Sequence, residues 1–381
     1  MNFCRWVVAG ATLWSCGIWA QSYHRDNFRD IRWLGRGNTG IAVINDGTAL
    51  FYNPAGIGMQ NVYSFSVLNP SLGANENIYT SAAGLSSLTG GSESITSKFG
   101  PFLGKPLGLT GSVFPHIAVP NFAGGFWDYF DTSLQYRNPV NPELYMDARN
   151  DYGIILGTGF GYQQNFAFGV SLRYHRRRLL SESITGSRAL TLVQGASGST
   201  LASLMKKGEG FGINVGIQSK FEVNKATWVA LGGAVEDLGA TKFKSALGNA
   251  PIQQGMQMNI GSALGIKTTL LDLTIFADGR QLNVPGLHDS KKIFMGTEFS
   301  FLKTDFRAGL FQGYWTLGAS LRLFPLFDID LATYGEEVGY ASGIKQNRIW
   351  MLGISTGIGL NVGGKKQSKS GKKYRSQLDA L

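Results

Sequence analysis

Residues 166–175 read FAFGVSLRYH, and this stretch decides the fold class because its side chains alternate in character. The first, third, fifth and seventh side chains are large and apolar, whereas those between them are small or polar. A period of two is typical of a β-strand with one apolar face and one polar face. The same alternation recurs at 211–218, 271–276 and 350–360, so the sequence predicts an all-β protein.

A water-soluble β-sandwich also alternates, so other features must separate it from a membrane barrel. The candidate strands run for roughly 10 to 15 residues, which suits a tilted membrane crossing. Aromatic residues such as Tyr152, Tyr162 and Trp228 gather near strand ends, where an interface girdle lies. The chain also carries only 16% charged residues, well below the quarter usual in soluble domains. These features favour an antiparallel transmembrane β-barrel.

The connections between candidate strands alternate between short and long, as they do in outer-membrane barrels. Short turns fall at 163–165, 223–226, 268–269, 303–304 and 325–326. Counting gives twelve crossings after residue 120, one at 62–68 and one between them, hence a closed barrel of fourteen strands. Both termini would then be periplasmic. The second crossing is the hardest to place because it contains Pro115 and Pro120. We expect residues 71–111 and 179–210 to be long outward loops.

The first twenty residues predict an export signal, with Arg5 before an apolar run and a cut after Ala20. That run is too short to span a bilayer as a helix. Both cysteines, Cys4 and Cys16, lie in it, so the mature chain would have no disulfide and no thiolate nucleophile. Lipidation at Cys16 is the alternative to simple cleavage.

The net charge of +10 is concentrated near the end of the chain. Residues 363–381 form a basic tail, predicted to be periplasmic, that could contact the cell wall or a periplasmic partner. In an exported protein this charge does not predict nucleic-acid binding.

Gly35, Gly37 and Gly40 have the spacing G-x-G-x-x-G of a dinucleotide-binding turn. No apolar strand precedes them and no α/β alternation follows, so we reject that interpretation. The surrounding segment, residues 21–60, is Gly-rich and lacks a core of its own. A fourteen-strand barrel is too wide for its own side chains to fill. We therefore expect residues 21–60 to form a plug inside a barrel of residues 61–362.

Residues 39–58, TGIAVINDGTALFYNPAGIG, resemble the N-terminal hatch signature of the FadL-like outer-membrane transporters of fatty acids and hydrocarbons. The matching residues are Gly40, Ala42, Asp46, Ala49, Asn53, Pro54, Ala55 and Gly56. Gly47 departs from the pattern, since the family often has a second Asp there. Residues 331–360 resemble the final hairpin of the wider superfamily, which includes PorV- and PorQ-like secretion proteins.

The resemblance implies that hydrophobic molecules enter from outside, bind in an apolar pocket and leave sideways through a gap in the wall. The hatch and ligand residues it implies are Asp46, Phe51, Asn53, Pro54, Ala55 and Gly56. In the family the gap lies at a kink in the third strand. Gly124 and Gly125 are the candidate kink here, and a bulge after them would turn Asp128 inward. The alternative is that Asp128 lies outside the hydrocarbon zone.

Charged residues on strand faces are the remaining candidates. We expect six of them to point into the lumen, as a selectivity network or simply as a wet wall: Asp272, Asp278, Arg280, Glu298, Asp328 and Asp330. A second cluster would reach the outer rim, where it could bind lipopolysaccharide phosphates or attract a fatty-acid carboxylate: Arg173, Arg176, Arg177 and Arg178.

No catalytic constellation is visible, because the four histidines are isolated and no nucleophile lies beside a base. We predict neither a metal nor a cofactor, and no enzyme activity. The sequence favours an outer-membrane channel for hydrophobic small molecules such as long-chain fatty acids. The alternative is a PorV-like docking protein for secreted or envelope partners, and a third possibility is a cell-wall anchor.

Overall fold

The computed structural model describes residues 25–80, 100–138, 140–141, 143–162, 165–185, 204–245, 249–268, 271–324, 327–338 and 341–360. The predicted signal peptide (1–20) and basic tail (363–381) lie outside the described residues. In the part of the chain that is described, no helix is long and apolar enough to cross a membrane.

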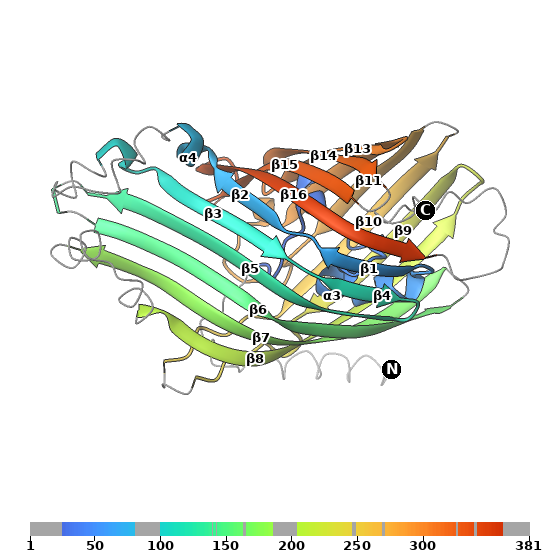
Figure 1. Cartoon of the computed structure of the whole chain (residues 1–381), viewed down its shortest axis with the longest axis horizontal. Helices are drawn as coiled ribbons and strands as arrows, with labels where there is room; N and C mark the ends of the chain where they lie inside the picture. Colours follow the sequence, from blue (N-terminus) through green and yellow to red (C-terminus); the bar gives the residue numbers. More distant parts are fainter. Residues whose placement is uncertain are drawn as a thin grey trace, which may run out of the picture.

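The strands form one antiparallel sheet that closes on itself through the pairings β1–β16 and β5–β6 (Figure 1). The first five strands are β1 (Tyr63–Leu68), β2 (Ser71–Asn75), β3 (Pro106–Val113), β4 (His116–Val119) and β5 (Phe122–Arg137). The next six are β6 (Glu143–Tyr162), β7 (Phe166–Thr185), β8 (Lys206–Glu222), β9 (Thr227–Glu236), β10 (Gln257–Lys267) and β11 (Leu271–Gly279). The last five are β12 (Ile293–Phe301), β13 (Thr304–Phe311), β14 (Tyr314–Phe324), β15 (Phe327–Glu337) and β16 (Gln346–Leu360).

These sixteen elements make fourteen crossings, because β1 and β2 share one crossing and β3 and β4 share the next. The predicted fourteen-strand barrel is therefore confirmed. The predicted short turns at 223–226 and 303–304 are confirmed, since each joins two consecutive strands of the wall. The predicted turns at 163–165, 268–269 and 325–326 lie wholly or partly outside the described residues.

The predicted outward loops were too long. Residues 71–75 form β2 and residues 106–113 form β3, so much of the expected 71–111 loop belongs to the wall. Likewise β7 continues to Thr185 and β8 begins at Lys206. Strand ends that project beyond an apolar band do not alternate in hydrophobicity, so the sequence pattern does not mark them.

The wall is interrupted at its first two crossings, between the β1–β4 and β2–β3 pairings. The register changes by one residue there, from Ser66 opposite His116 to Ser71 opposite Ser112. We call residues 67–70 and 113–115 the strand interruption. Pro70 and Pro115 lie in it, and proline cannot donate a ladder hydrogen bond.

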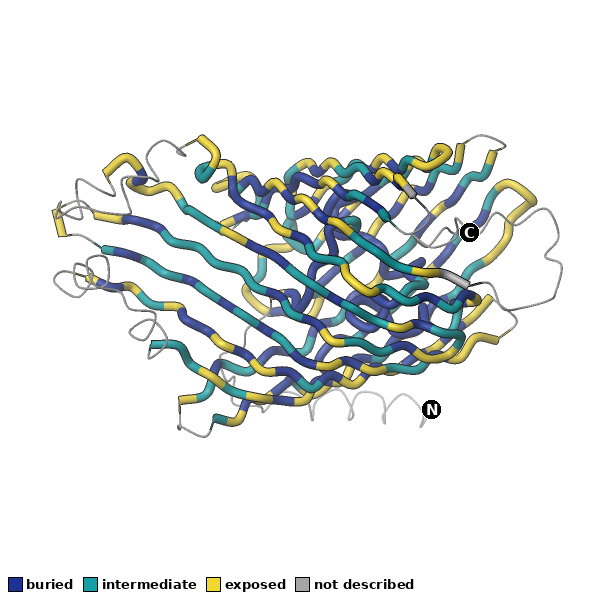
Figure 2. Tube along the Cα trace, viewed as in Figure 1, coloured by how far each residue is buried: buried dark blue, intermediate teal, exposed yellow. Residues whose placement is uncertain are grey.

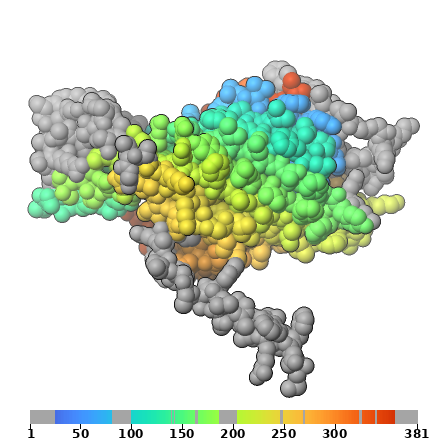
Figure 3. All heavy atoms as spheres, turned by 90° about the horizontal axis from the view of Figure 1, so that it is seen from below, coloured from blue at the N-terminus to red at the C-terminus, as the bar shows by residue number. Residues whose placement is uncertain are grey.

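The adjoining wall, from β5 to β8, is continuous. Strand β5 pairs with β6 in a single register from Phe122 to Arg137, and β6 pairs with β7 from Glu143 to Thr185. These long strands extend past the rest of the barrel at the left of Figure 1. Seen from below, the wall is one surface that runs from teal to orange in chain order (Figure 3).

Exposed and buried residues alternate along these strands (Figure 2). On the outer face, the pairing places Phe126, Ile154, Tyr174 and Phe211 in one line across β5 to β8. The next outward-facing line consists of Asp128, Tyr152, Arg176 and Glu209. We call this second line the polar row, and it ends the apolar part of the outer surface.

Residues 25–62 lie inside the barrel, where Figure 1 shows them in blue. This N-terminal segment holds α2 (Ile31–Gly35), α3 (Ala49–Tyr52) and the 3-10 helix η1 (Pro54–Met59). Helix α2 packs against β13 to β16, whereas η1 packs against β5 to β8. The remaining helices are α4 (Glu76–Thr80), η3 (Gly100–Phe102) and η4 (Asp289–Lys291).

Candidate functional site

Glycines let the backbone of the N-terminal segment lie directly on the wall. Gly37 has a φ of 76°, and a Cβ there would lie 2.3 Å from the carbonyl oxygen of Met295. On the other side of the barrel, a Cβ at Gly169 would lie 2.2 Å from the carbonyl oxygen of Pro54. In the G-x-G-x-x-G stretch, Gly35 and Gly37 therefore serve close packing against strands, and Gly40 serves packing against Arg36 within the segment.

Asn53 joins two parts of the segment to the wall and is fully buried. Its amide nitrogen donates to the carbonyl of Ile41 at 2.7 Å and to the carbonyl of Ile217 at 3.0 Å. Its side-chain oxygen accepts from the backbone N–H of Ala55 and so caps η1. Pro54 occupies the first turn of that helix, where its missing N–H costs nothing.

Gly56 completes this turn, because a side chain there would run into the carbonyl of Ile44, 1.9 Å from the Cβ position. Ala55 is fully buried beside it. The motif Asn53–Gly56 thus fixes a tight backbone path pressed against β7 and β8.

Asp46 holds the segment's own fold together on the opposite side. It accepts from the backbone N–H and the hydroxyl of Thr48, and its carboxylate pairs with Arg32 at 3.0 Å. Burial alone would raise the pKa of Asp46, but Arg32 and the Thr48 hydrogen bonds outweigh it and lower that pKa. Asp46 is therefore a structural anion held by its neighbours.

The Gly47 departure has a steric basis in this chain. A Cβ at position 47 would lie 2.0 Å from the His116 ring, which extends from β4. His116 in turn stacks on Phe114 with ring centroids 4.5 Å apart. A second Asp at position 47 would have no room.

An aromatic cluster lies between the segment and the strand interruption. Phe51 stacks on Phe28 at 4.6 Å and meets Phe114 and Trp127 edge-on at 5.1 and 5.4 Å. Phe114 belongs to the interruption and is fully buried. Its backbone N–H has no ladder partner and instead donates to the side-chain oxygen of Asn69 at 2.6 Å. A side chain therefore holds the wall together where the ladder stops.

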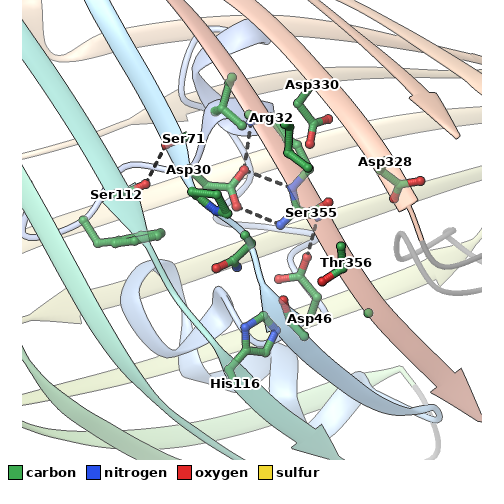
Figure 4. Close-up of a pocket in the computed structure, with 18 of the residues that line it drawn as sticks. Asp30, Arg32, Asp46, Ser71, Ser112, His116, Asp328, Asp330, Ser355 and Thr356 are labelled. Carbon is green, nitrogen blue, oxygen red and sulfur yellow. Dashed lines mark hydrogen bonds and ion pairs between the residues drawn. The ribbon is translucent and has the colours of Figure 1, made fainter. Parts of the chain in front are cut away.

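A small cavity of about 50 Å³ adjoins the same place (Figure 4). Figure 4 shows Asp30 and Arg32 of the segment facing Ser71 and Ser112 of the wall. Asp46 and His116 lie at its other end. The cavity separates the segment from the wall on this side, in contrast to the close contact at β7 and β8.

A larger cavity of about 640 Å³ opens toward the long loops. Its lining is charged and includes Arg25, Arg29, Asp131, Arg280 and Glu336. Both of these cavities have a mixed polar and apolar lining with several charged side chains, whereas the resemblance implied an apolar pocket. Among the described residues, the apolar surface next to the segment is packed, in the aromatic cluster and in two further clusters around Ile31 and Leu34 and around Ala42 and Val43.

Three of the six predicted lumen charges bind the N-terminal segment. Asp278 accepts from the backbone N–H groups of Gly40 and Ile41 at 2.7 and 3.1 Å. Arg280 pairs with Asp26 at 3.2 Å, and Glu298 pairs with Arg36 at 3.3 Å. These charges therefore hold the segment in place.

The other three predicted lumen charges have different surroundings. Asp328 and Asp330 line the small cavity, and Asp330 accepts a hydrogen bond from Ser320. Asp272 is half-buried on the strand face that also carries Thr274 and Asp278, with no ion pair among the described residues.

The expected bulge after Gly124 and Gly125, with an inward turn of Asp128, is wrong. Strand β5 keeps one register with β6 through Gly124 and Gly125, so no bulge is present. Asp128 stays on the outer face, where Asn150 donates to it at 2.6 Å. The ladder with β6 is continuous here, whereas the ladder on the β3–β4 side of β5 is interrupted opposite Phe126 and Trp127. Asp128 belongs to the polar row, which agrees with the alternative that it lies beyond the apolar zone.

The predicted arginine cluster does not act as a unit, because strand side chains alternate between faces. Arg173 and Arg177 point into the barrel and are buried, paired with Asp237 at 2.5 Å and with Asp151 at 2.7 Å. Only Arg176 and Arg178 face outward. Trp228, predicted for the interface girdle, is also buried on the lumen side, against Gly265.

The sequence analysis missed the cations of the segment. Arg29 pairs with Glu336 at 3.0 Å, and Arg32 and Arg36 pair as described above. Arg29, Arg32 and Arg36 recur at helical spacing, but this spacing does not identify partners on the wall. Only the predicted position inside a polar lumen could have indicated such partners.

The chain is similar to solved toluene transporters. TbuX of Ralstonia pickettii is 11% identical with a TM-score of 0.45, over 89% of this chain and 99% of that chain. TodX of Pseudomonas putida is 10% identical with a TM-score of 0.39, over 90% and 100%. A Pseudomonas aeruginosa FadL homologue is 12% identical with a TM-score of 0.35, over 89% and 98%. Neither a protein-family model nor a curated protein matches the chain.

Proposed function

We propose that this chain is an outer-membrane channel for hydrophobic small molecules such as long-chain fatty acids, with both termini in the periplasm. Residues 21–60 act as its hatch, residues 61–362 as its barrel and residues 363–381 as a periplasmic tail. The hatch motif at 39–58 and the apolar outer face of the wall support this function. The channel needs no catalytic group and no cofactor.

The strand interruption is the observation that carries the proposal. A lateral exit requires a place where the wall can part without leaving many ladder groups unpaired. Residues 67–70 and 113–115 form such a place, since Asn69 already replaces a ladder bond there. We therefore assign the exit to the first two crossings and not to Gly124 and Gly125.

The chemistry beside the interruption suits an apolar substrate. Phe28, Phe51 and Phe114 line its inner side, and Val67 and Leu68 are exposed on its outer side. The aromatic cluster is packed and the adjoining cavity of about 50 Å³ holds only a few waters. The structure is thus a closed state, and passage requires the aromatic side chains to move apart.

Filling the small cavity tests the exit. Ser112 lines it from the wall, so Ser112→Trp should obstruct movement of the hatch beside the interruption. We expect uptake of a labelled long-chain fatty acid by a deletion strain carrying this variant to fall by about tenfold, equivalent to about 1.4 kcal/mol.

Ser262→Trp is the matched control, because Ser262 lies on the outer face of β10 between Ile260 and Leu264. Both variants should show the heat-dependent gel mobility of a folded barrel. Equal uptake by the two variants would place the exit elsewhere. Normal uptake in the deletion strain itself would refute the transport function.

The charged side chains of the larger cavity favour a second candidate, a docking protein for secreted or envelope partners. The cavity of about 640 Å³ offers charged side chains from both the segment and the wall. A stoichiometric partner that co-purifies with the full chain and is lost on truncation at Gly364 would support this role.

A further inference from the structure

The outer surface beside the polar row carries an excess of positive charge. Arg178 of β7 and Lys207 of β8 face outward and lie directly opposite each other in the ladder. Like charges at directly opposed positions repel and destabilise a sheet. In the described part of the chain, no carboxylate forms a salt bridge with either side chain.

Two more cations extend this surface. Arg176 is the neighbouring outward-facing residue of β7, opposite Glu209. Lys244 lies beside them because residues 209 and 244 form an antiparallel bridge. Glu209 pairs with Arg176 at 3.4 Å, with both side chains more than half exposed. Arg176, Arg178, Lys207 and Lys244 surround a shallow cavity of about 280 Å³, which we call the basic pocket.

Tyrosine hydroxyls orient the arginines of this pocket. Arg178 donates to the Tyr152 hydroxyl at 3.4 Å and lies over its ring at 5.3 Å. Arg176 donates to the Tyr174 hydroxyl at 3.3 Å. The guanidinium groups thus lie at the edge of the apolar outer surface, next to the line of residues that contains Phe126, Ile154 and Phe211.

We infer that the basic pocket binds the phosphate group of an outer-leaflet lipid, a phosphorylated glycolipid of the lipid A type. An anion between Arg178 and Lys207 removes their repulsion, and arginine and lysine together suit phosphate. The position next to the apolar surface allows one molecule to place its phosphate in the pocket and its acyl chains against the wall. This inference rests on the proposed outer-membrane location and not on transport.

Native mass spectrometry of the detergent-purified full chain with bisphosphorylated lipid A tests the inference. Each cation near a membrane surface contributes about fivefold in affinity, so Arg178→Ala, Lys207→Ala and Lys244→Ala combined should weaken binding on the order of a hundredfold. Glu209→Gln should strengthen binding a few-fold, because it removes a competing carboxylate.

A triple variant of Lys105, Lys225 and Lys303 to alanine is the charge-matched control, since all three are exposed and lie away from the pocket. It should bind lipid A like the wild type. Equal weakening in both triple variants, or equal binding of dephosphorylated lipid A, would overturn the inference. Displacement of lipid A by millimolar inorganic phosphate would identify free phosphate as the ligand and overturn the lipid assignment. Fatty-acid uptake is measured separately, so its failure leaves this result interpretable.

Discussion

The two sides of the N-terminal segment contact the barrel in different ways. Against β6 to β8, the backbone of η1 touches the wall itself, as at Gly169 and Pro54. Against β1 to β4, side chains such as Asp46, His116 and Phe51 fill the space, and a cavity remains. The backbone contact at β7 leaves no room for movement, whereas the side chains that face β1 to β4 can rotate. The difference indicates which side of the segment is fixed and which side can open.

The wall differs in the same sense. Strands β5 to β8 keep one register over their whole paired length, while the first two crossings lose it at two prolines. The fixed side of the segment thus faces the continuous wall, and the adjustable side faces the strand interruption.

The largest expected effect comes from breaking the fixed contact. In Gly169→Ala, the new methyl group would meet the carbonyl of Pro54 at 2.2 Å. We expect the free energy of unfolding in urea to fall by about 2 to 3 kcal/mol, the cost of overpacking a filled site. Proteolysis at Arg29 and Arg32 should become faster because the segment is displaced.

Gly233→Ala is the matched control on β9, where the nearest atom to a new Cβ is 3.5 Å away. Its free energy of unfolding should change by about 0.5 kcal/mol or less. If the two variants are equally stable, the backbone contact at β7 is not what fixes the segment.

Asp46→Asn tests the adjustable side. The variant removes one of the two carboxylates that pair with Arg32, the other being Asp30 at 2.8 Å, and should lower the free energy of unfolding at pH 7 by about 2 kcal/mol. Because the folded pKa of Asp46 is lowered from 3.8, the wild-type advantage is full above that pH and is lost as the pH falls below it.

Thermal unfolding between pH 2 and pH 6 measures this difference. The difference between the wild type and Asp46→Asn should begin to shrink near pH 3.8, where Asp46 becomes protonated in the unfolded chain, and should vanish as the pH falls through the lower folded pKa. A gap that does not depend on pH would mean that Asp46 acts through packing and not through its charge.

Asn69→Ala tests the strand interruption and should have the smallest effect on stability of the three variants. It removes the hydrogen bond to the Phe114 N–H and should cost about 1 kcal/mol. Hydrogen exchange at residues 64–71 and 112–118 should accelerate, while that of β5 and β6 stays unchanged.

Asn224→Ala provides the control, because Asn224 also accepts from backbone N–H groups, those of Ala226 and Thr227 at 2.8 Å. It should cost a similar amount without faster exchange at the interruption. Uniform acceleration in both variants would show that the first two crossings are no weaker than the rest of the wall.

Much of the barrel could be predicted from the sequence because alternation and turn residues are local signals. The short turns and the count of fourteen follow from them. The second crossing resisted placement for a physical reason, since Pro115 truly divides it into β3 and β4. The ends of β7 and β8 were missed because their apolar residues, such as Leu179 and Leu180, do not alternate with polar ones.

The site was harder to predict because it depends on faces and registers. Alternation places Arg173 and Arg177 on the same face as Ser171, so their lumen position could have been read from the strand pattern. The proposed exit could not have been predicted from the strand pattern, because Asn69 and Phe114 are in contact although they lie 45 residues apart in the chain. The roles of Asp46 and Asn53 in transport stay predictions, although both residues are now seen to hold the segment.

The contacts of α2 have a consequence for how the protein matures. The carbonyl of Gly35 accepts a hydrogen bond from Thr316, 281 residues further along the chain, and Arg29 binds Glu336 of β15. Contacts between such distant residues form late in folding, since a long loop must close first. The first part of the described chain to be synthesised therefore waits for the last strands before it is seated. Closure of the barrel and seating of the segment inside it therefore belong to the same late stage of folding.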